Sequence, residues 1–260
     1  MATDVSPLNR ITLAIEPPVA RITLNNSPVN VIDMPMMEEL TSVLADIEPD
    51  AQIYAIVLRG DGDNFSAGVD VAAHTPDKVN SMVEKFHGVV RSLIASKKVT
   101  IAAVHGNCLG GGAELAMMCD IVITSDDATW GFPEIRLGCF PPIAATALGA
   151  LIGQKRASDL ILTGATTQGT EAAEIGLATR AVAADNMDAA IKEAIEHLQK
   201  LSPVALAIAK KAIYSWDSIH FDKGLARSEK IYLEELMKTE DAREGIKAFL
   251  EKRNPMWQGR

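Results

Sequence analysis

Cysteines and aromatic residues are scarce in this sequence. Its 260 residues include three cysteines and 5% aromatic residues, and no two cysteines have Cys-x-x-Cys spacing. We therefore expect reduced, structural thiols in a cytoplasmic protein rather than a disulfide framework. No two histidines have metal-ligand spacing with a third ligand nearby, so we expect no metal site.

The sequence also lacks an excess of positive charge and a long apolar run. Its net charge is −9, which argues against general binding to nucleic acid or to anionic membranes. The longest weakly charged stretch, residues 138–153, is interrupted by Pro141 and Pro142 and is too short to span a bilayer. The N-terminus has no apolar signal region. We expect neither a membrane nor a nucleic-acid partner.

What the sequence does contain is organised around residues 100–120, TIAAVHGNCLGGGAELAMMCD. A β-branched run enters three glycines and continues as a helix with one acid, Glu114. The rest of this helix is apolar on all sides, which predicts burial. A carboxylate at the start of a buried helix is costly unless it is paired or used. Glu114 could simply favour the helix dipole, but we interpret it as a functional acid.

A second candidate acid, Glu134, follows Glu114 by twenty positions and comes directly after Pro133. An acid after a proline is also common in the first turn of a helix, where it has no catalytic role. We favour the functional interpretation because only these two acids lie in apolar, glycine-marked surroundings.

The hydrophobic pattern predicts a mixed α/β core followed by helices. Strands and helices alternate up to about residue 185, and the rest is helical in pattern. His87 lies off the apolar stripe of its predicted helix, which predicts a surface position. The sequence thus divides into a core over residues 1–185 and a helical region over 186–260. The expected C-terminal helices include 203–216, 221–237 and 241–252.

Five blocks resemble one family, and they cover nearly the whole chain: LNNSPVNVID (24–33), FSAGVD (65–70), HGNCLGGGAELAMMCD (105–120), WGFPEIRLG (130–138) and EGIKAFLEKRNP (244–255). They resemble the enoyl-CoA hydratase/isomerase, or crotonase, superfamily. The resemblance implies an α/β fold, a spiral of β-β-α units with a C-terminal helical region. It further implies an acyl-CoA substrate, no separate cofactor, and self-association as a homotrimer or a dimer of trimers.

The resemblance also implies roles for four residues. Glu114 would orient and deprotonate a water molecule, and Glu134 would donate a proton to the α-carbon. The backbone N–H groups of Ala67 and Gly111 would form an oxyanion hole for the thioester oxygen. Because close acids titrate as a pair, the separate roles of the two glutamates are provisional.

Seven further residues are candidates for substrate binding: Ser66, Gly68, Asp70, Gly110, Phe140, Pro142 and Lys252. We interpret Asp70 as a local helix cap rather than a catalyst. Lys252 matches the family position that contacts the CoA phosphates, although a solvated lysine at a helix end is an equally good interpretation. Phe249 and Leu250 would lie either in a subunit interface or in the core.

One departure from the family concerns the segment after the second acid. Typical hydratases have a glycine-rich segment there, whereas this chain has Pro141 and Pro142, and Pro142 has no N–H to offer. The stretch GCFPPIAA resembles the cyclohexa-1,5-diene-1-carbonyl-CoA hydratases. We therefore predict an enoyl-CoA hydratase, with a cyclic dienoyl-CoA as its favoured substrate. A general short-chain 2-enoyl-CoA hydratase, an isomerase and a catalytically silent acyl-CoA-binding protein remain alternatives.

Overall fold

The computed structural model describes residues 8–259, except for the side chains of residues 215–220. Its larger sheet has six strands in the order β1-β2-β3-β4-β6-β9, and its smaller sheet has the order β5-β7-β8. In the larger sheet β1 and β2 are antiparallel and the other neighbours are parallel. The strands are β1 (Ile11–Glu16), β2 (Val19–Leu24), β3 (Ala55–Gly60), β4 (Val99–Val104), β5 (Asn107–Leu109), β6 (Ile121–Ser125), β7 (Thr129–Gly131), β8 (Thr166–Gln168) and β9 (Arg180–Val182).

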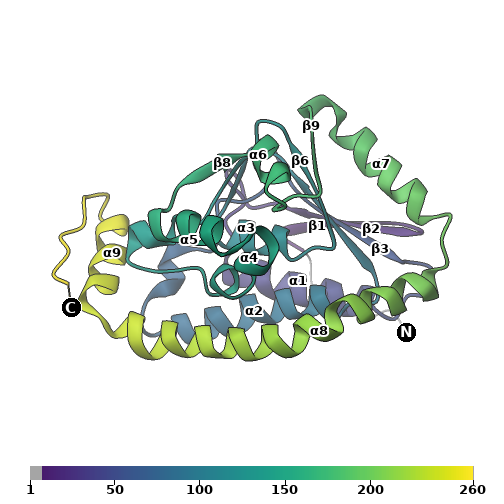
Figure 1. Cartoon of the computed structure of the whole chain (residues 1–260). Coiled ribbons are helices and arrows are strands. Elements are labelled where there is room, and N and C mark those ends of the chain that lie inside the picture. The colour runs from purple at the N-terminus through teal and green to yellow at the C-terminus, as the bar shows by residue number, and fades with distance from the viewer. Residues whose placement is uncertain (1–7, 260) are drawn as a thin grey trace.

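Helices follow most of the strands and then occupy the whole C-terminal part of the chain (Figure 1). The α-helices are α1 (Met34–Ile47), α2 (Val79–Ala95), α3 (Gly111–Met117), α4 (Pro142–Ile152), α5 (Gln154–Thr163), α6 (Gly169–Glu174), α7 (Met187–Leu198), α8 (Pro203–Lys230) and α9 (Glu240–Leu250). The shorter turns are η1 (Val71–His74), η2 (Pro133–Leu137), η3 (Ala184–Asn186), the π-turn η4 (Ile231–Glu235) and η5 (Leu236–Lys238).

The central strands are buried on both faces, which explains their continuous apolar runs. Along β3, Ile56 and Leu58 belong to the large core cluster, which includes α1, α2 and α3. Ala55 and Val57 belong to a second cluster on the opposite face, which α7 covers. Successive side chains of a strand point to opposite faces, so one strand supports both cores. The larger core carries α3 and its acid.

Two glycines shape the chain between β4 and α3. Gly106 has φ of 57°, and a Cβ added there would come within 1.8 Å of the carbonyl oxygen of Asp63. Gly110 has φ of 52° and a Cβ there would lie 2.6 Å from Oε1 of Glu134. Both positions therefore need a residue without a side chain. Their compact turn brings α3 and Glu134 together.

β1 and β2 form an antiparallel hairpin, and α1 starts after Asp33. The Asp33 carboxylate accepts a hydrogen bond from the amide of Met36 at 3.0 Å, as an N-cap residue does. All seven residues of α3 are buried, as the apolar pattern predicts. Thus the α/β core and the helical C-terminal region were both predicted correctly.

Two predictions about helices were wrong or incomplete. The segments 203–216 and 221–237 form one continuous helix, α8, up to Lys230, followed by η4 and η5. Neither proline nor glycine occurs between residues 216 and 221, so nothing in the local sequence stops the helix there. Residues 142–152 form α4, which was not predicted because this stretch is small and apolar and has no clear polar face.

A buried ion pair fixes α8 to the core. Lys210 Nζ lies 2.8 Å from Asp120 Oδ2, and it also donates to the carbonyl oxygens of Leu93 and Lys98 at 2.9 Å each. Asp120 in turn accepts from the amide and hydroxyl of Thr100. Removing one partner of such a buried pair lowers the stability of the protein far more than the intact pair raises it. In Figure 1, α8 runs along the lower edge of the molecule, past α2, towards α9.

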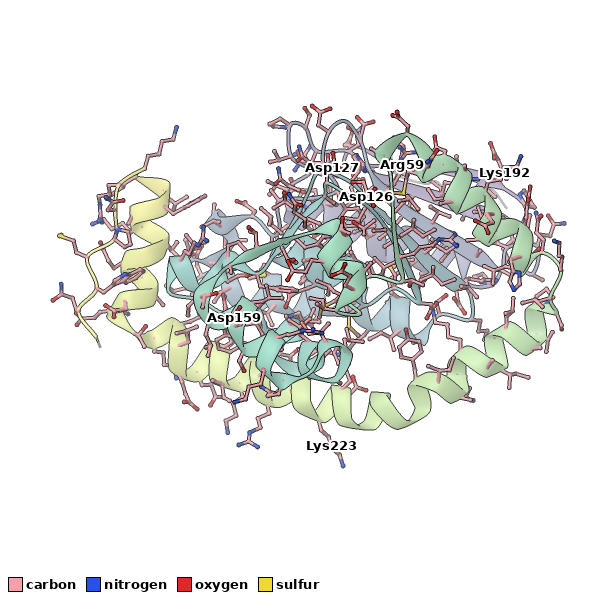
Figure 2. The ribbon with its side chains drawn as sticks, turned by 45° about the horizontal axis from the view of Figure 1, so that its top comes forward. Arg59, Asp126, Asp127, Asp159, Lys192 and Lys223 are labelled. Atoms are coloured by element: carbon pink, nitrogen blue, oxygen red, sulfur yellow. The ribbon has the colours of Figure 1, made fainter. Side chains whose placement is uncertain are left out.

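Figure 2 shows charged side chains at the surface, including Asp126, Asp127, Asp159, Lys192 and Lys223. These exposed groups are on turns and outer helix faces, away from the two cores. Over the described residues, no helix is both long and apolar enough to cross a bilayer.

Candidate active site

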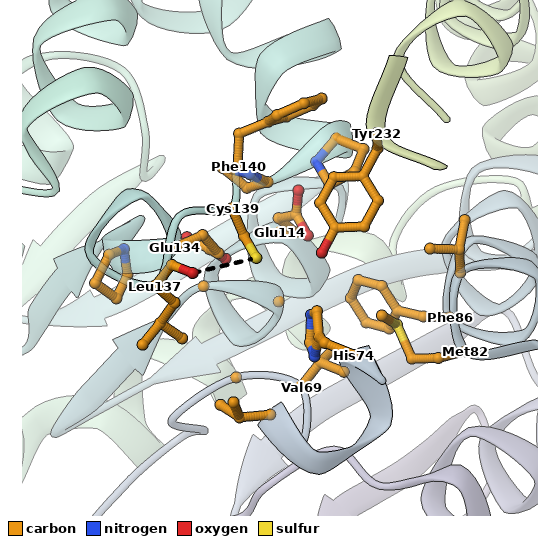
Figure 3. Close-up of a pocket in the computed structure, with 18 of the residues that line it drawn as sticks. Val69, His74, Met82, Phe86, Glu114, Glu134, Leu137, Cys139, Phe140 and Tyr232 are labelled. Atoms are coloured by element: carbon orange, nitrogen blue, oxygen red, sulfur yellow. Dashed lines mark hydrogen bonds between the residues drawn. The ribbon is translucent and has the colours of Figure 1, made fainter. Parts of the chain in front are cut away.

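A cavity that is partly open to solvent lies between the turn before α3 and the C-terminal helical region. Most of its wall is apolar. The side chains with ionisable groups that line it are His74, His87, Glu114, Glu134, Cys139 and Tyr232. In Figure 3, Glu114, Cys139 and Tyr232 come together on one side of the cavity. A largely apolar cavity with a few converging polar groups is typical of a small-molecule site.

Glu114 is held in the cavity wall by the first turns of two helices. It lies in the first turn of α3, is 3% exposed, and faces the first turn of α4. The amide of Ala144 donates to its Oε1 at 2.9 Å. Burial raises the pKa of Glu114 to about 7, and hydrogen bonding to the amides of Ala144 and Ile143 limits the rise. The carboxyl can therefore exchange a proton near neutral pH.

Glu134 occupies the first turn of η2, after Pro133. Its Oε2 is buried and has no hydrogen-bond partner among the described residues. Burial and, second, the neighbouring charge of Glu114 raise the pKa of Glu134 to about 8. The two carboxyls are therefore close enough to oppose each other's ionisation. Near neutral pH this favours a state in which the pair retains a proton.

Pro142 is the first residue of α4, where a missing N–H costs nothing. The amides that follow it supply the hydrogen bonds to Glu114 instead. Pro142 and Phe140, two of the predicted substrate-binding residues, both line the cavity. The proline therefore stiffens the wall without depriving Glu114 of donors.

The prediction that Ala67 supplies an oxyanion-hole donor conflicts with the structure. The Ala67 amide donates to the carbonyl oxygen of Val29 at 2.8 Å, so this donor is already used. The amide of Val69, two residues later, faces Gly111 instead: a Cβ added at Gly111 would lie 3.3 Å from Val69 N. Neither the Val69 nor the Gly111 amide donates to a backbone oxygen within the described chain. The pair of free donors is therefore Val69 and Gly111.

The other predicted binding residues divide into two groups. Gly68 and Gly110 line the cavity, whereas Ser66 is fully buried beneath it and donates from Oγ to Asn30 O at 2.7 Å. Asp70 caps η1 by accepting from the amide of Ala72 at 3.0 Å, as its interpretation as a local cap predicts. Ser66 and Asp70 thus shape the loop that carries Val69.

Lys252 lies outside the cavity wall, at the end of α9. It has φ of 54°, in the left-handed region, and the next amide, of Arg253, donates back to Ala248 O at 3.0 Å. This is the backbone of a helix C-terminus. Its contact with CoA stays a prediction. Phe249 and Leu250 are 52% and 50% exposed, so neither belongs to the core of the chain.

Sequence reasoning missed several residues of the site. His87 is 2% exposed and lines the cavity, so its predicted surface position was wrong. Its Nδ1 lies 2.7 Å from Oε1 of Glu229, on α8. The helical spacing from Val83 through His87 to Val90 could have indicated burial. Tyr232 and Ile246 come from the C-terminal region, and no local signal connects them to the acids.

Within the described residues no group of three or more His, Cys, Asp and Glu side chains is arranged to hold a metal ion. All three cysteines are buried and unpaired. Burial raises the pKa of Cys139, the one in the cavity wall, to about 11. This thiol is therefore protonated at neutral pH and is a poor nucleophile.

Comparisons with known proteins agree over nearly the full length. A family model described as enoyl-CoA hydratase/isomerase matches residues 14–260. The chain is 35% identical to cyclohexa-1,5-dienecarbonyl-CoA hydratase of Thauera aromatica over 260 residues, covering 100% of both. It is 34% identical to short-chain-enoyl-CoA hydratase of Clostridium acetobutylicum, covering 95% of this chain and 96% of the relative. An enoyl-CoA hydratase/isomerase structure from Xanthobacter autotrophicus Py2 matches with a TM-score of 0.85 at 29% identity, covering 95% and 98%.

Replacing Glu134 by Gln should stabilise the protein increasingly as pH rises. The folded-state pKa of Glu134, about 8, lies above its unfolded value, so the stability that protonation provides is lost as pH rises through about 8. A glutamine cannot ionise. Its advantage in free energy of unfolding should therefore grow between pH 5 and 8, by at most about 1.4 kcal/mol per pH unit, and then level off.

Chemical unfolding at a series of pH values measures this difference. Glu174→Gln, at an exposed site on α6, is the matched control and should show no such trend. A pH-independent difference between Glu134→Gln and the wild type would contradict the raised pKa.

Proposed function

The chain belongs to the enoyl-CoA hydratase/isomerase family and is a lyase of the hydratase type, and we propose that it adds water to a cyclic, conjugated dienoyl-CoA thioester. The crotonase-like fold predicted from the sequence is that of the solved relatives. The full-length relative from Thauera aromatica is named for a cyclic substrate of this kind. The proposal that the acyl group is a ring is based mainly on the residues that form the cavity wall.

The wall around the two acids is apolar and stiff. Phe140 and Tyr232 make an edge-to-face contact, with ring centroids 5.3 Å apart and an angle of 87° between the rings. Pro141 and Pro142 continue the same wall and have restricted backbones. A surface built from rings and prolines favours a rigid, flat acyl group over a flexible chain, because little conformational freedom is lost on binding.

The thioester oxygen would bind between the amides of Val69 and Gly111. Hydration builds negative charge on this oxygen as the double-bond electrons move towards the thioester. Two fixed donors stabilise that charge, and the loss of one such donor typically costs about 3 kcal/mol. Residues 66–70 hold the Val69 amide in place through hydrogen bonds of Ser66 and Asp70.

The two proton transfers of water addition are then divided between the two acids. Glu114, as the carboxylate, takes one proton from water while the water oxygen bonds to the β-carbon. Glu134, as the carboxylic acid, gives its proton to the α-carbon. Burial raises the pKa of both acids, so near neutral pH the pair can hold one carboxylate and one carboxylic acid, as this step needs. The step consumes one water molecule and requires no cofactor, because coenzyme A is part of the substrate.

Self-association as a trimer or as a dimer of trimers is part of the proposal. Large apolar side chains are exposed along α8 and at the end of α9, among them Val204, Ile208, Ile213, Phe249 and Leu250. Exposed apolar groups of this kind favour a subunit interface. Lys252, next to the last two of these residues, would contact the CoA phosphates.

Replacing either acid should abolish most turnover without preventing acyl-CoA binding. Glu114→Gln removes the base and Glu134→Gln the acid, and each should lower kcat by roughly 10²- to 10⁴-fold. Steady-state hydration kinetics together with titration calorimetry of a saturated acyl-CoA separate the two effects. The exposed Glu174→Gln variant should retain wild-type kcat. Near-full activity of either cavity variant would remove that residue from the mechanism.

The cyclic substrate should be preferred over a linear one. The absorbance change on mixing with cyclohexa-1,5-diene-1-carbonyl-CoA or crotonyl-CoA, with mass analysis for added water, gives kcat/KM for each. We expect a preference for the ring of about tenfold or more, a size within reach of pocket shape alone. Phe140→Ala, which opens the wall, should reduce this preference.

Three results would contradict the proposed substrate. Preference for crotonyl-CoA would make the protein a general short-chain hydratase, like the Clostridium acetobutylicum relative by name. A shifted double bond without added mass would indicate an isomerase. Tight binding without turnover would indicate a silent acyl-CoA-binding protein.

A further inference from the structure

Tyr232 reaches the cavity from the C-terminal part of the chain. It is 2% exposed and lines the same cavity as Glu114 and Glu134. Figure 3 shows its hydroxyl turned towards Glu114 and Cys139. Among the described residues of the cavity wall, it is the one side chain with a hydroxyl group.

The hydroxyl of Tyr232 has a weak partner. It lies beside the thiol of Cys139, and thiols are poor donors and acceptors. A buried tyrosine hydroxyl usually finds a strong partner. Burial, Cys139 and then the two glutamate charges raise the pKa of Tyr232, so the group stays protonated and can donate. A better acceptor entering the cavity could therefore take a hydrogen bond from it.

Apart from the Val69 and Gly111 amides, which are assigned to the thioester oxygen, the other donors near the acids are already used. Pro142 has no N–H, and the Ala144 amide donates to Glu114. Nδ1 of His74 lies 3.0 Å from Asp70 O, and Nδ1 of His87 lies 2.7 Å from Glu229. Within the described cavity wall, the hydroxyl of Tyr232 is thus the side-chain donor best placed to meet an oxygen bound beside Glu114.

The chain fixes Tyr232 firmly in this place. Glu229, three residues earlier, is bound by His87 at 2.7 Å and by Arg91 Nη2 at 2.8 Å, both on α2. Ser228 contacts the hydroxyl of Thr146 on α4 at 3.1 Å. Tyr232 itself lies in the π-turn η4, a distortion that occurs frequently at functional sites. Anchors on two helices therefore hold the tyrosine over the acids.

We propose that Tyr232 is a further catalytic residue, whose hydroxyl donates a hydrogen bond to the oxygen that is added to the acyl group. The water oxygen accepts this bond while Glu114 removes a proton from the same water. Tyr232 keeps its own proton throughout. In the reverse direction the same bond stabilises the leaving hydroxyl. The inference is based on the proposed hydration and adds a specific role for the C-terminal region.

Tyr232→Phe tests the role because it removes the hydroxyl and keeps the ring. We expect kcat for hydration to fall roughly 10- to 100-fold, as for one lost hydrogen bond to a developing charge, with KM changed by less than about threefold. Tyr54→Phe is the matched control. Tyr54 packs against the second core cluster, outside the cavity, and this variant should retain wild-type kcat.

A second reaction separates a bond to water from a general effect on the cavity. Exchange of the α-hydrogen of butyryl-CoA in D₂O needs the oxyanion donors and Glu134 but adds no water. Tyr232→Phe should leave this exchange within about threefold of the wild type while hydration falls. An equal fall in both reactions would mean that Tyr232 acts by shaping the cavity, and would overturn the inference.

The outcomes for the two proposals differ. If the wild-type protein hydrates no enoyl-CoA, the proposed function fails, whatever the variant does. If the wild type hydrates its substrate and Tyr232→Phe does so equally fast, the proposed function stands and the role of Tyr232 is refuted.

Discussion

The burial of two carboxyl groups beside each other is the constraint that the rest of the site satisfies. Glu114 and Glu134 lie in an apolar cavity where ionising both is unfavourable, so both pKa values rise towards neutrality. The first turn of α4 limits the cost for Glu114 through the Ala144 amide, whereas Oε2 of Glu134 has no partner in the described chain. This difference in hydrogen bonding favours a state in which one carboxyl is ionised while the other keeps its proton.

Several segments of the fold contribute to this arrangement. The glycine turn before α3 brings Glu134 against Gly110, and the loop at Val69 lies against Gly111. The C-terminal helical region closes the other side through Tyr232. That region is coupled to the core by the Lys210–Asp120 ion pair and to α2 by Glu229. The site is therefore assembled from segments that are distant in sequence.

Much of the fold and the pair of acids could be predicted from the sequence, because their signals are local. Hydrophobic periodicity, the Asp33 cap and the glycine turn each depend on neighbouring residues. The sequence analysis placed a free amide donor at Ala67 instead of Val69 because sequence does not reveal which amide of a turn points inward. His87 and Tyr232 were missed because their burial depends on α8, which joins the core only through tertiary contacts. Long-range packing is the part that local patterns do not encode.

The pH dependence of kcat/KM for hydration tests the shared-proton mechanism most directly, because this ratio reports the ionisation of the free enzyme. In the proposed mechanism, hydration needs Glu114 ionised and Glu134 protonated. The ratio should therefore rise with pH through about 7 and fall again through about 8, giving a narrow bell. A broad plateau that begins at about pH 4 to 5, where unperturbed glutamates titrate, would contradict the account.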